Sequence, residues 1–267
     1  MSGQCLALFS GKGGVGRTLL TAAFGAHLAS EGKRVALVDL NTGMRGLDMA
    51  LGVESRVAFD LGDVLDGLCS ARQALVKAPG EMRLLAARQV RDSETLDEEG
   101  LRHVVDELRE TFDWVLLDTA GGIGRGFSAA AACGSQAVAV TTPDDAAIRC
   151  VERAAGLWQR LDGQAPLLLV NRICARWVRE GLQYAPQTCA QVLDMPLCGV
   201  VPEDEQAMRA WLSKKPLLGE SPAAMGVKNA LERMKNPAAK LWDWEAAQPQ
   251  AETEKERKPF WKKRRGR

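Results

Sequence analysis

The feature that most restricts the fold of this sequence is a glycine-rich loop between an apolar run and a helical pattern. The loop reads Gly11-Lys12-Gly13-Gly14-Val15-Gly16-Arg17-Thr18. The apolar run before it is Cys5–Phe9, and the helical pattern after it is carried by Leu20, Phe24 and Leu28. Glycines let backbone N–H groups approach phosphate oxygens, and the following helix adds its positive N-terminal end. The sequence therefore predicts a buried strand, a phosphate-binding loop and a helix, in that order.

Short apolar runs recur along the chain and are separated by amphipathic stretches such as Leu101–Leu108 and Val227–Met234. The runs are apolar on consecutive residues, which is typical of strands buried on both faces. Strand–helix alternation predicts an α/β fold, with a mainly parallel twisted sheet and helices on both faces. The runs are Cys5–Phe9, Val35–Leu40, Leu84–Ala87, Trp114–Leu117, Ala137–Val140, Leu167–Val170 and Leu197–Val201.

Composition narrows the class of protein. Of 267 residues, 46% are hydrophobic and 26% charged, which is typical of a globular protein and argues against a wholly disordered or collagen-like chain. No apolar run approaches the roughly 18 residues of a membrane-spanning helix, and the start, Met1–Gln4, does not resemble a secretory signal. The 7 cysteines form no C-x-x-C pair, so we expect reduced thiols in a cytoplasmic protein and no zinc site.

Charge is distributed unevenly along the chain. Residues 255–267 hold eight Lys/Arg and one Glu, a local charge of +7, whereas the remainder holds 27 Lys/Arg and 33 Asp/Glu, a charge of −6. Before this basic end, the polar stretch 245–257 lacks apolar periodicity. The sequence predicts one folded domain over 1–244, a linker over 245–257 and a basic tail over 258–267 that meets something anionic.

The loop departs from the general pattern G-x-x-x-x-G-K-[ST] at Arg17, where lysine is expected. A second cation, Lys12, follows the first glycine. Arginine is a flat fork, whereas lysine is a compact point charge on a slim stem. We therefore expect nucleotide binding to survive and phosphoryl transfer, which depends on positioning, to be weakened. Thr18 is placed to offer its hydroxyl to Mg²⁺.

This loop resembles the K-G-G-x-G-K-[ST] loop of the MinD/ParA ATPases, and in particular the MinD branch. The resemblance extends in order and spacing over roughly residues 3–235, and it implies the P-loop NTPase architecture of that family. The further segments that carry it are Val38–Asp48, Asp113–Ile123, Thr141–Asp144, Val170–Arg172 and Gly199–Asp204.

The resemblance implies ATP and Mg²⁺ as cofactors and an ATP-dependent homodimer with the nucleotides between the subunits. Lys12 matches the signature lysine that reaches the partner's phosphates. The implied metal residues are Thr18, Asp39 and Asp118, although the two aspartates are also common at strand ends for structural reasons. The implied adenine residues are Asn171, Arg172, Pro202, Glu203 and Asp204; an isolated Asn or a Pro-Glu-Asp turn would usually be structural.

Three departures from the family concern hydrolysis. Arg17 replaces the loop lysine, and Asn41 stands where a second aspartate of the first switch is expected, without a carboxylate charge. Cys150 takes the Asp position of the V-R-D segment. With Lys12, Arg17 and Asn41 as the catalytic candidates, we expect a Mg²⁺-dependent ATP hydrolase of low turnover.

The tail resembles the membrane-targeting helix that ends MinD relatives, though with a poorer apolar face. Its membrane candidates are Phe260, Trp261, Lys262, Lys263, Arg264 and Arg265. A merely solubilising tail and one that contacts nucleic acid are the alternatives. We expect a peripheral protein on the inner face of the cell membrane, with two tails of a dimer acting together.

The resemblance implies an ATPase switch that helps to place the division septum, with regulators of the MinC and MinE kind as partners. One alternative is a non-hydrolysing ATP-dependent scaffold. Another is a ParA-like positioning protein on DNA, which the acidic body disfavours. Neither a metal cluster nor a nucleic-acid partner is expected.

Overall fold

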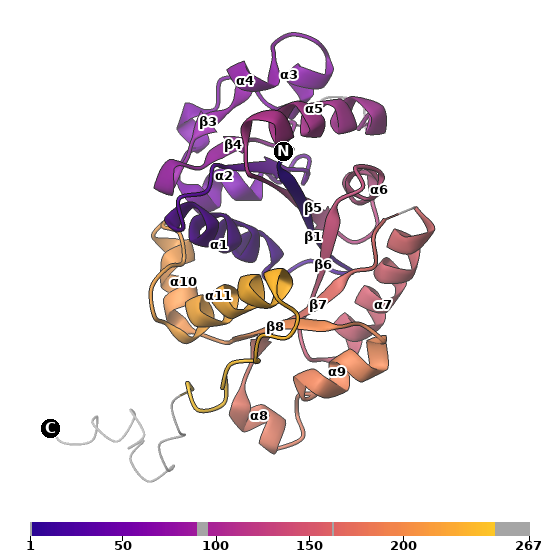
Figure 1. Ribbon diagram of the computed structural model, residues 1–267, viewed down its shortest axis with the longest axis vertical. Helices are drawn as coiled ribbons and strands as arrows, with labels where there is room; N and C mark the ends of the chain where they lie inside the picture. The colour runs from indigo at the N-terminus through magenta and orange to yellow at the C-terminus, as the bar shows by residue number, and fades with distance from the viewer. Residues whose placement is uncertain (1, 90–95, 162, 249–267) are drawn as a thin grey trace, which may run out of the picture.

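The structure is a computed structural model that describes residues 2–89, 96–161 and 163–248. Its strands are β1 (Gln4–Ser10), β2 (Val35–Asp39), β3 (Val76–Lys77), β4 (Arg83–Leu85), β5 (Trp114–Gly121), β6 (Gln136–Thr141), β7 (Leu167–Ile173) and β8 (Leu197–Pro202). Within the described ranges they form one 8-stranded sheet in the order β3-β4-β2-β5-β1-β6-β7-β8 (Figure 1). Neighbours pair in parallel except β3 with β4. The predicted mainly parallel sheet is confirmed.

Each predicted apolar run lies in or overlaps a strand, because these segments are buried on both faces of the sheet. The edge strand β3 was not predicted, since two residues carry no periodic pattern. Strand β5 continues past its apolar run through Asp118 and Thr119, both fully buried. Polar residues that end a buried strand in this way mark the edge of the sheet where the candidate site lies.

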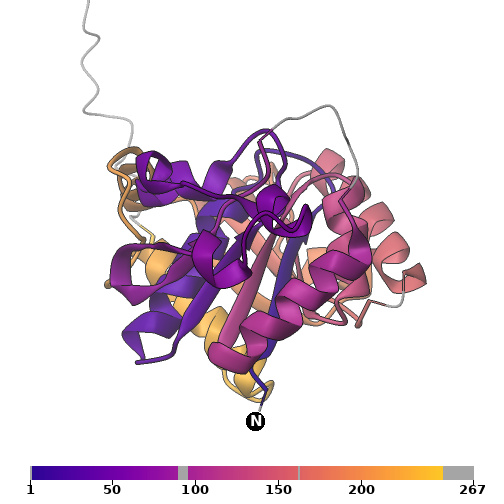
Figure 2. The same cartoon turned by 90° about the horizontal axis from the view of Figure 1, so that it is seen from above.

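Helices cover both faces of the sheet (Figure 2). One buried cluster contains side chains of α1 (Arg17–Ser30), α2 (Gly46–Leu51) and α11 (Pro222–Lys235). The other contains side chains of α5 (Glu98–Thr111), α6 (Arg125–Ala132), α7 (Asp145–Arg160) and α9 (Pro186–Leu193). The remaining helices and turns are η1 (Glu54–Arg56), α3 (Leu61–Leu65), α4 (Ala71–Ala74), η2 (Pro79–Glu81), α8 (Ala175–Arg179) and α10 (Glu205–Leu212).

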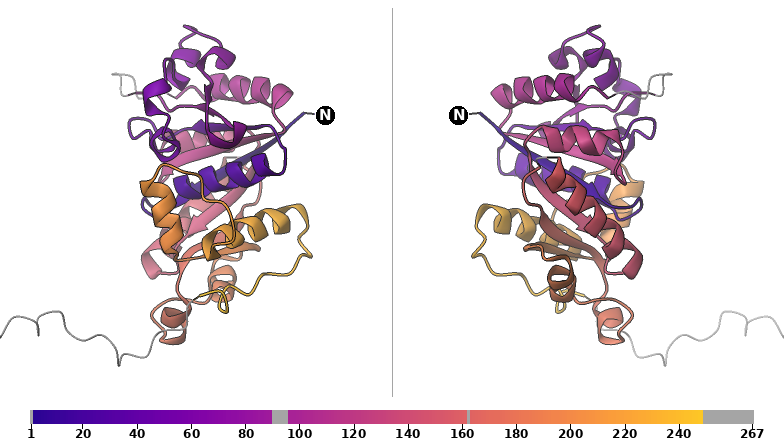
Figure 3. Two further views of the ribbon diagram at one scale, coloured as in Figure 1. Left: turned by 90° about the vertical axis from the view of Figure 1, so that its left-hand side faces the viewer. Right: turned by 90° about the vertical axis from the view of Figure 1, so that its right-hand side faces the viewer.

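Helix α5 shows how the spacing of apolar residues determines which face of a helix is buried. Leu101, Val104, Val105 and Leu108 are buried at helical spacing, whereas His103 between them is exposed. Helix α1 is different, because it lies beside α11 (Figures 1 and 3) and is buried on most of its surface. The helix that follows the phosphate loop is therefore held between the sheet and α11.

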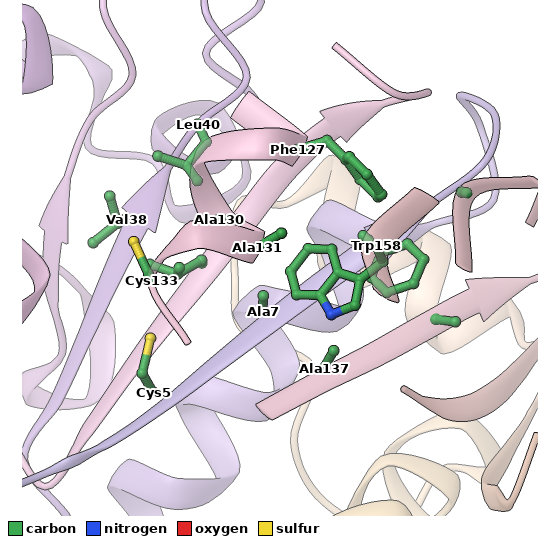
Figure 4. Close-up of a cluster of buried hydrophobic side chains, with 14 of the residues drawn as sticks. Cys5, Ala7, Val38, Leu40, Phe127, Ala130, Ala131, Cys133, Ala137 and Trp158 are labelled. Atoms are coloured by element: carbon green, nitrogen blue, oxygen red, sulfur yellow. The ribbon is translucent and has the colours of Figure 1, made fainter. Parts of the chain in front are cut away.

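Three aromatic rings form the centre of one face. Phe9 stacks on Trp158 with ring centroids 4.8 Å apart, and Phe127 meets both rings edge-on. Phe127 and Trp158 lie side by side in Figure 4. Such pairs contribute about 0.5–1.5 kcal/mol each beyond the area that they bury. Cys5 and Cys133 belong to the same cluster, and burial raises the pKa of the Cys133 thiol to about 12. Thiols held in this environment stay protonated and unreactive.

After α11 the chain continues to pack on the body. Trp244 is buried, and the Trp242 indole Nε1 donates to the Val200 carbonyl at 3.0 Å. The Gln248 side chain accepts from the Ala175 backbone N–H at 2.9 Å and donates to the Ile173 carbonyl at 3.1 Å. These contacts extend beyond residue 244, the predicted end of the domain. None of the helices in the described ranges has the length and apolar character to cross a membrane.

Candidate nucleotide-binding site

A cavity of about 570 Å³ opens at the carboxyl ends of β1, β7 and β8. Ligands of open α/β sheets bind at this edge of the sheet. The cavity collects predicted site residues from distant parts of the sequence. Those lining it are Gly13, Gly14, Val15, Gly16, Arg17, Thr18, Asn41, Asn171, Arg172, Pro202, Glu203 and Asp204.

The loop backbone needs its glycines for two physical reasons. Gly14 and Gly16 have φ of 81° and 90°, which L side chains rarely adopt. A Cβ on Gly16 would also lie 2.4 Å from Asn171 Nδ2, and one on Gly11 would lie 2.1 Å from the Cys150 carbonyl oxygen. The Asn171 amide donates to the Val15 carbonyl at 2.7 Å. Strand β7 and helix α7 therefore hold the loop in place.

The predicted adenine residues form one wall of the cavity. Arg172 lies in the left-handed region at φ 59°, and its Nε donates to Glu203 Oε2 at 2.8 Å. Asp204 also has a structural role, because its Oδ1 accepts from Gln206 N at 2.8 Å and its Oδ2 from Ala223 N at 3.0 Å. It thus caps α10 and fixes the start of α11 against it.

An apolar wall of the cavity was missed by sequence reasoning. Ala207, Met208 and Trp211 of α10 line it together with Leu217. Residues 207, 208 and 211 share one side of a helix, and that spacing in the sequence was the available signal. This wall offers apolar side chains that a nucleobase can contact, whereas the loop offers backbone N–H groups.

Arg17 does not extend freely into the cavity. Its Nε donates to Asp118 Oδ1 at 2.7 Å and its Nη1 to Ser10 Oγ at 3.0 Å. Only 6% of the Arg17 side chain and 0% of the Asp118 side chain are exposed, so this ion pair is closed to solvent. Thr21 Oγ1 lies 3.3 Å from the same Asp118 oxygen. Asp118 Oδ2 is buried without a hydrogen-bond partner among the described residues.

Asp39 lies next to Asp118 on the neighbouring strand, with the two residues in register. It accepts backbone N–H groups of Asn41 at 2.9 Å and Leu47 at 3.0 Å. Burial, and then the negative charge of Asp118, raise the pKa of Asp39 well above its usual range. Asp39 therefore orders the segment between β2 and α2 through its hydrogen bonds.

The predicted magnesium residues fit the ion unequally. Thr18 lines the cavity in the first turn of α1, where its hydroxyl can meet a cation held by phosphates. Asp39 and Asp118 are fully buried and do not line it. Across the described ranges, no group of three or more His, Cys, Asp or Glu side chains is placed to hold a metal ion. Of the three, Thr18 is placed to meet a cation in the cavity, and the two aspartates are not.

Lys12 lies at the surface rather than on the cavity wall. Its Nζ is 3.6 Å from Asp144 Oδ1, and the two side chains are 39% and 47% exposed. Asp144 also caps α7 by accepting from Ala147 N at 3.0 Å. An exposed pair at this distance contributes little to stability, so Lys12 can change partners at small cost.

The tail residues from Phe260 to Arg265 lie outside the described residues.

Comparison with known proteins agrees with a nucleotide-binding role for the cavity. Residues 6–217 match the CobQ/CobB/MinD/ParA nucleotide binding domain. The septum site-determining protein MinD of Bacillus subtilis is 37% identical over 212 residues, covering 78% of this chain and 79% of the relative. The MinD protein of Synechocystis is 34% identical over 249 residues, covering 91% and 94%.

Solved structures agree with these relatives. The MinC:MinD cell division protein complex of Aquifex aeolicus superposes with a TM-score of 0.82 at 31% identity, covering 90% of this chain and 98% of that one. MinD complexed with Mg-ADP from Pyrococcus horikoshii gives 0.76 at 28% identity, covering 88% and 97%. With its phosphate loop, sheet and cavity arranged as described, this chain belongs to the MinD/ParA nucleotide-binding family, among the septum-site-determining MinD ATPases.

Proposed function

We propose that this chain is an ATP-controlled switch that dimerises with ATP, associates with the inner face of the membrane and helps to place the division septum. The observation that carries the proposal is the cavity at residues 13–18, which joins a phosphate loop to an apolar wall. Its volume of about 570 Å³ lies in the range of small-molecule sites. ATP would place its phosphates on the loop and its base between Arg172 and Trp211.

Hydrolysis is proposed to be slow. The Arg17 guanidinium is engaged with Asp118 and Ser10, so it cannot follow the phosphates without breaking a buried ion pair. Asn41 lines the cavity but carries no charge with which to orient a water molecule strongly. Because small misplacements of reacting groups cost large factors in rate, these two residues would lower turnover more than affinity.

Dimerisation is proposed to depend on Lys12. Its contact with Asp144 is long and exposed, so the phosphates of a partner subunit can compete for the ammonium group. The relative from Aquifex aeolicus forms a complex with MinC. Regulators of the MinC and MinE kind are therefore the partners that we propose.

Membrane association is proposed for the basic tail. Residues 255–267 carry the local charge of +7, and Phe260 and Trp261 supply the apolar insertion. Each Lys or Arg near an anionic surface contributes about 1 kcal/mol. One tail is a weak anchor, and two tails on a dimer make ATP strengthen binding through avidity.

A non-hydrolysing scaffold is the second candidate function. The buried pair of Arg17 and Asp118 favours it, because that pair can leave nucleotide binding intact while weakening chemistry. In this case ATP would control dimerisation and recruitment without being consumed.

Calorimetric titration of Gly16→Val with ATP tests the site. The new side chain would meet Asn171 and would be strained at φ 90°, so we expect binding to be lost. Gly156→Val is the control, because a Cβ at that helix position meets no atom within 4 Å. Light scattering with a non-hydrolysable ATP analogue then tests dimerisation. Unchanged ATP affinity in a folded Gly16→Val chain would exclude this cavity.

A further inference from the structure

Arg17 stands between Asp118 and the cavity. Arg17 is among the residues that line the cavity, whereas Asp118 is not and is fully buried. The positive charge on Asp118 comes from this guanidinium, through Nε at 2.7 Å, while the Asp39 carboxyl lies beside it on the neighbouring strand. Since an arginine side chain stays protonated in proteins, its positive charge on Asp118 is permanent.

The shape of arginine allows Arg17 to hold two groups at once. Nε holds Asp118 and Nη1 holds Ser10, while Nη2 is accessible and has no hydrogen-bond partner in the part of the chain that the structure describes. Arg17 also lines the cavity. One side chain can therefore remain on Asp118 and still present an N–H group and a positive charge to a phosphate.

Lysine cannot do this. It has a single nitrogen at the end of its stem, so it either follows the phosphates or stays on the carboxylate. With lysine at this position, a bound nucleotide would leave Asp118 as an uncompensated buried charge beside the phosphates. A divalent cation relieves such an arrangement, because it neutralises both the phosphates and the carboxylate.

We propose that Arg17 permanently neutralises Asp118, so that this chain binds a nucleoside diphosphate or triphosphate with little dependence on a divalent cation. The inference rests on the nucleotide binding proposed above and adds the role of Arg17 in it. Thr18 remains available to a cation that arrives with the phosphates, but the affinity does not require one. Asp39 and Asp118 are buried away from the cavity, and this proposal explains why the chain does not need them to hold a metal ion there.

The experiment measures the affinity of the full chain for mant-ADP by fluorescence, once with Mg²⁺ and once with a chelator. The diphosphate avoids hydrolysis. We expect chelation to weaken binding by less than about threefold in the natural chain and by about tenfold or more in Arg17→Lys, since the lysine leaves Asp118 without its charge-assisted contact. Arg34→Lys, at the exposed arginine paired with Asp113, is the matched control and should behave as the natural chain does.

A second variant keeps the test decisive where Arg17→Lys folds poorly. Asp118→Asn preserves the shape and an acceptor for Arg17 Nε while removing the charge, so it should bind mant-ADP in chelator at least as tightly as the natural chain. Weaker binding in an Asp118→Asn chain whose circular dichroism matches that of the natural chain, or a natural chain as sensitive to chelation as Arg17→Lys, would overturn the inference. Absence of binding in every chain, with or without Mg²⁺, would instead overturn the proposed nucleotide site.

Discussion

Two arginine–aspartate pairs connect the chain around α1 to β5, at opposite ends of the sheet. Arg17 begins α1 and binds Asp118 inside β5, whereas Arg34 comes after α1 and binds Asp113 just before β5. The Arg17 and Asp118 side chains are 6% and 0% exposed, and those of Arg34 and Asp113 are 64% and 38% exposed. The residue types and distances are alike, so burial is the variable that separates the two pairs.

The difference in burial shows which of the two ion pairs can affect function. In the exposed pair, water and salt screen the charges, and either partner can be solvated when the other is lost. In the buried pair, water cannot take the place of a partner that is lost. The end of the sheet that carries the cavity is therefore also the end where a single substitution changes the molecule most.

The largest effect should follow from breaking the buried pair. Asp118→Ala leaves the Arg17 guanidinium buried without its partner, and we expect a loss of about 3–5 kcal/mol in the free energy of unfolding. Urea denaturation followed by circular dichroism measures it. Asp113→Ala is the counterpart at the exposed end and should stay close to the natural chain. Equal losses in the two variants would show that burial does not separate the pairs.

Removing both buried charges should undo most of that loss. In Arg17→Met/Asp118→Leu, no charge remains to be desolvated, and replacement of a buried pair by apolar residues is often neutral or stabilising by about 1–4 kcal/mol. We expect this double variant to be at least as stable as the natural chain in the same urea experiment. A double variant as unstable as Asp118→Ala would show that packing, rather than charge, dominates this site.

A smaller effect is expected on turnover. Arg17→Lys frees the loop cation to follow the phosphates, and Asn41→Asp restores a charge near the attacking water. Together they should raise steady-state ATP turnover by about tenfold, equivalent to about 1.4 kcal/mol in the activation barrier. The two residues touch one transition state, so their effects need not add. Arg34→Lys should leave turnover unchanged; a natural chain already as fast as the double variant would remove the support for slow hydrolysis.

The smallest effect belongs to the exposed pair and depends on pH. Hydrogen bonds from the Arg34 side chain and backbone lower the pKa of Asp113 to about 2. The unfolded value is about 3.9, so any stabilisation is present above that pH and is lost as the pH falls toward the folded value. The difference in urea midpoint between the natural chain and Asp113→Asn should shrink from about pH 6 to about pH 3. A difference that grows on acidification would contradict this assignment.

Much of the fold could be predicted from the sequence, because a strand buried on both faces is apolar at every position, and such runs stand out. The loop could be predicted because Gly14 and Gly16 have few physical alternatives. The prediction that Asn171 and Glu203 lie beside the loop came from the family resemblance, because no local pattern indicates it.

The contacts inside the site could not be predicted. Arg17 and Asp118 are 101 positions apart, and no local pattern indicates that one would bind the other. Both were expected to face the ligand, since each residue type is common at phosphate and metal sites. The partner of Lys12, Asp144, was hidden for the same reason, because an ion pair across the fold is decided by packing.

The contact between Gly11 and the backbone of α7 has a mechanical consequence. A Cβ at Gly11 would overlap the carbonyl group of Cys150, so loop and helix meet backbone to backbone, with no side chain between them. A side chain in such a gap could change rotamer and absorb a displacement. Without one, any shift of the loop toward α7 must push the helix as a rigid rod, and its far end at Arg160 moves with it.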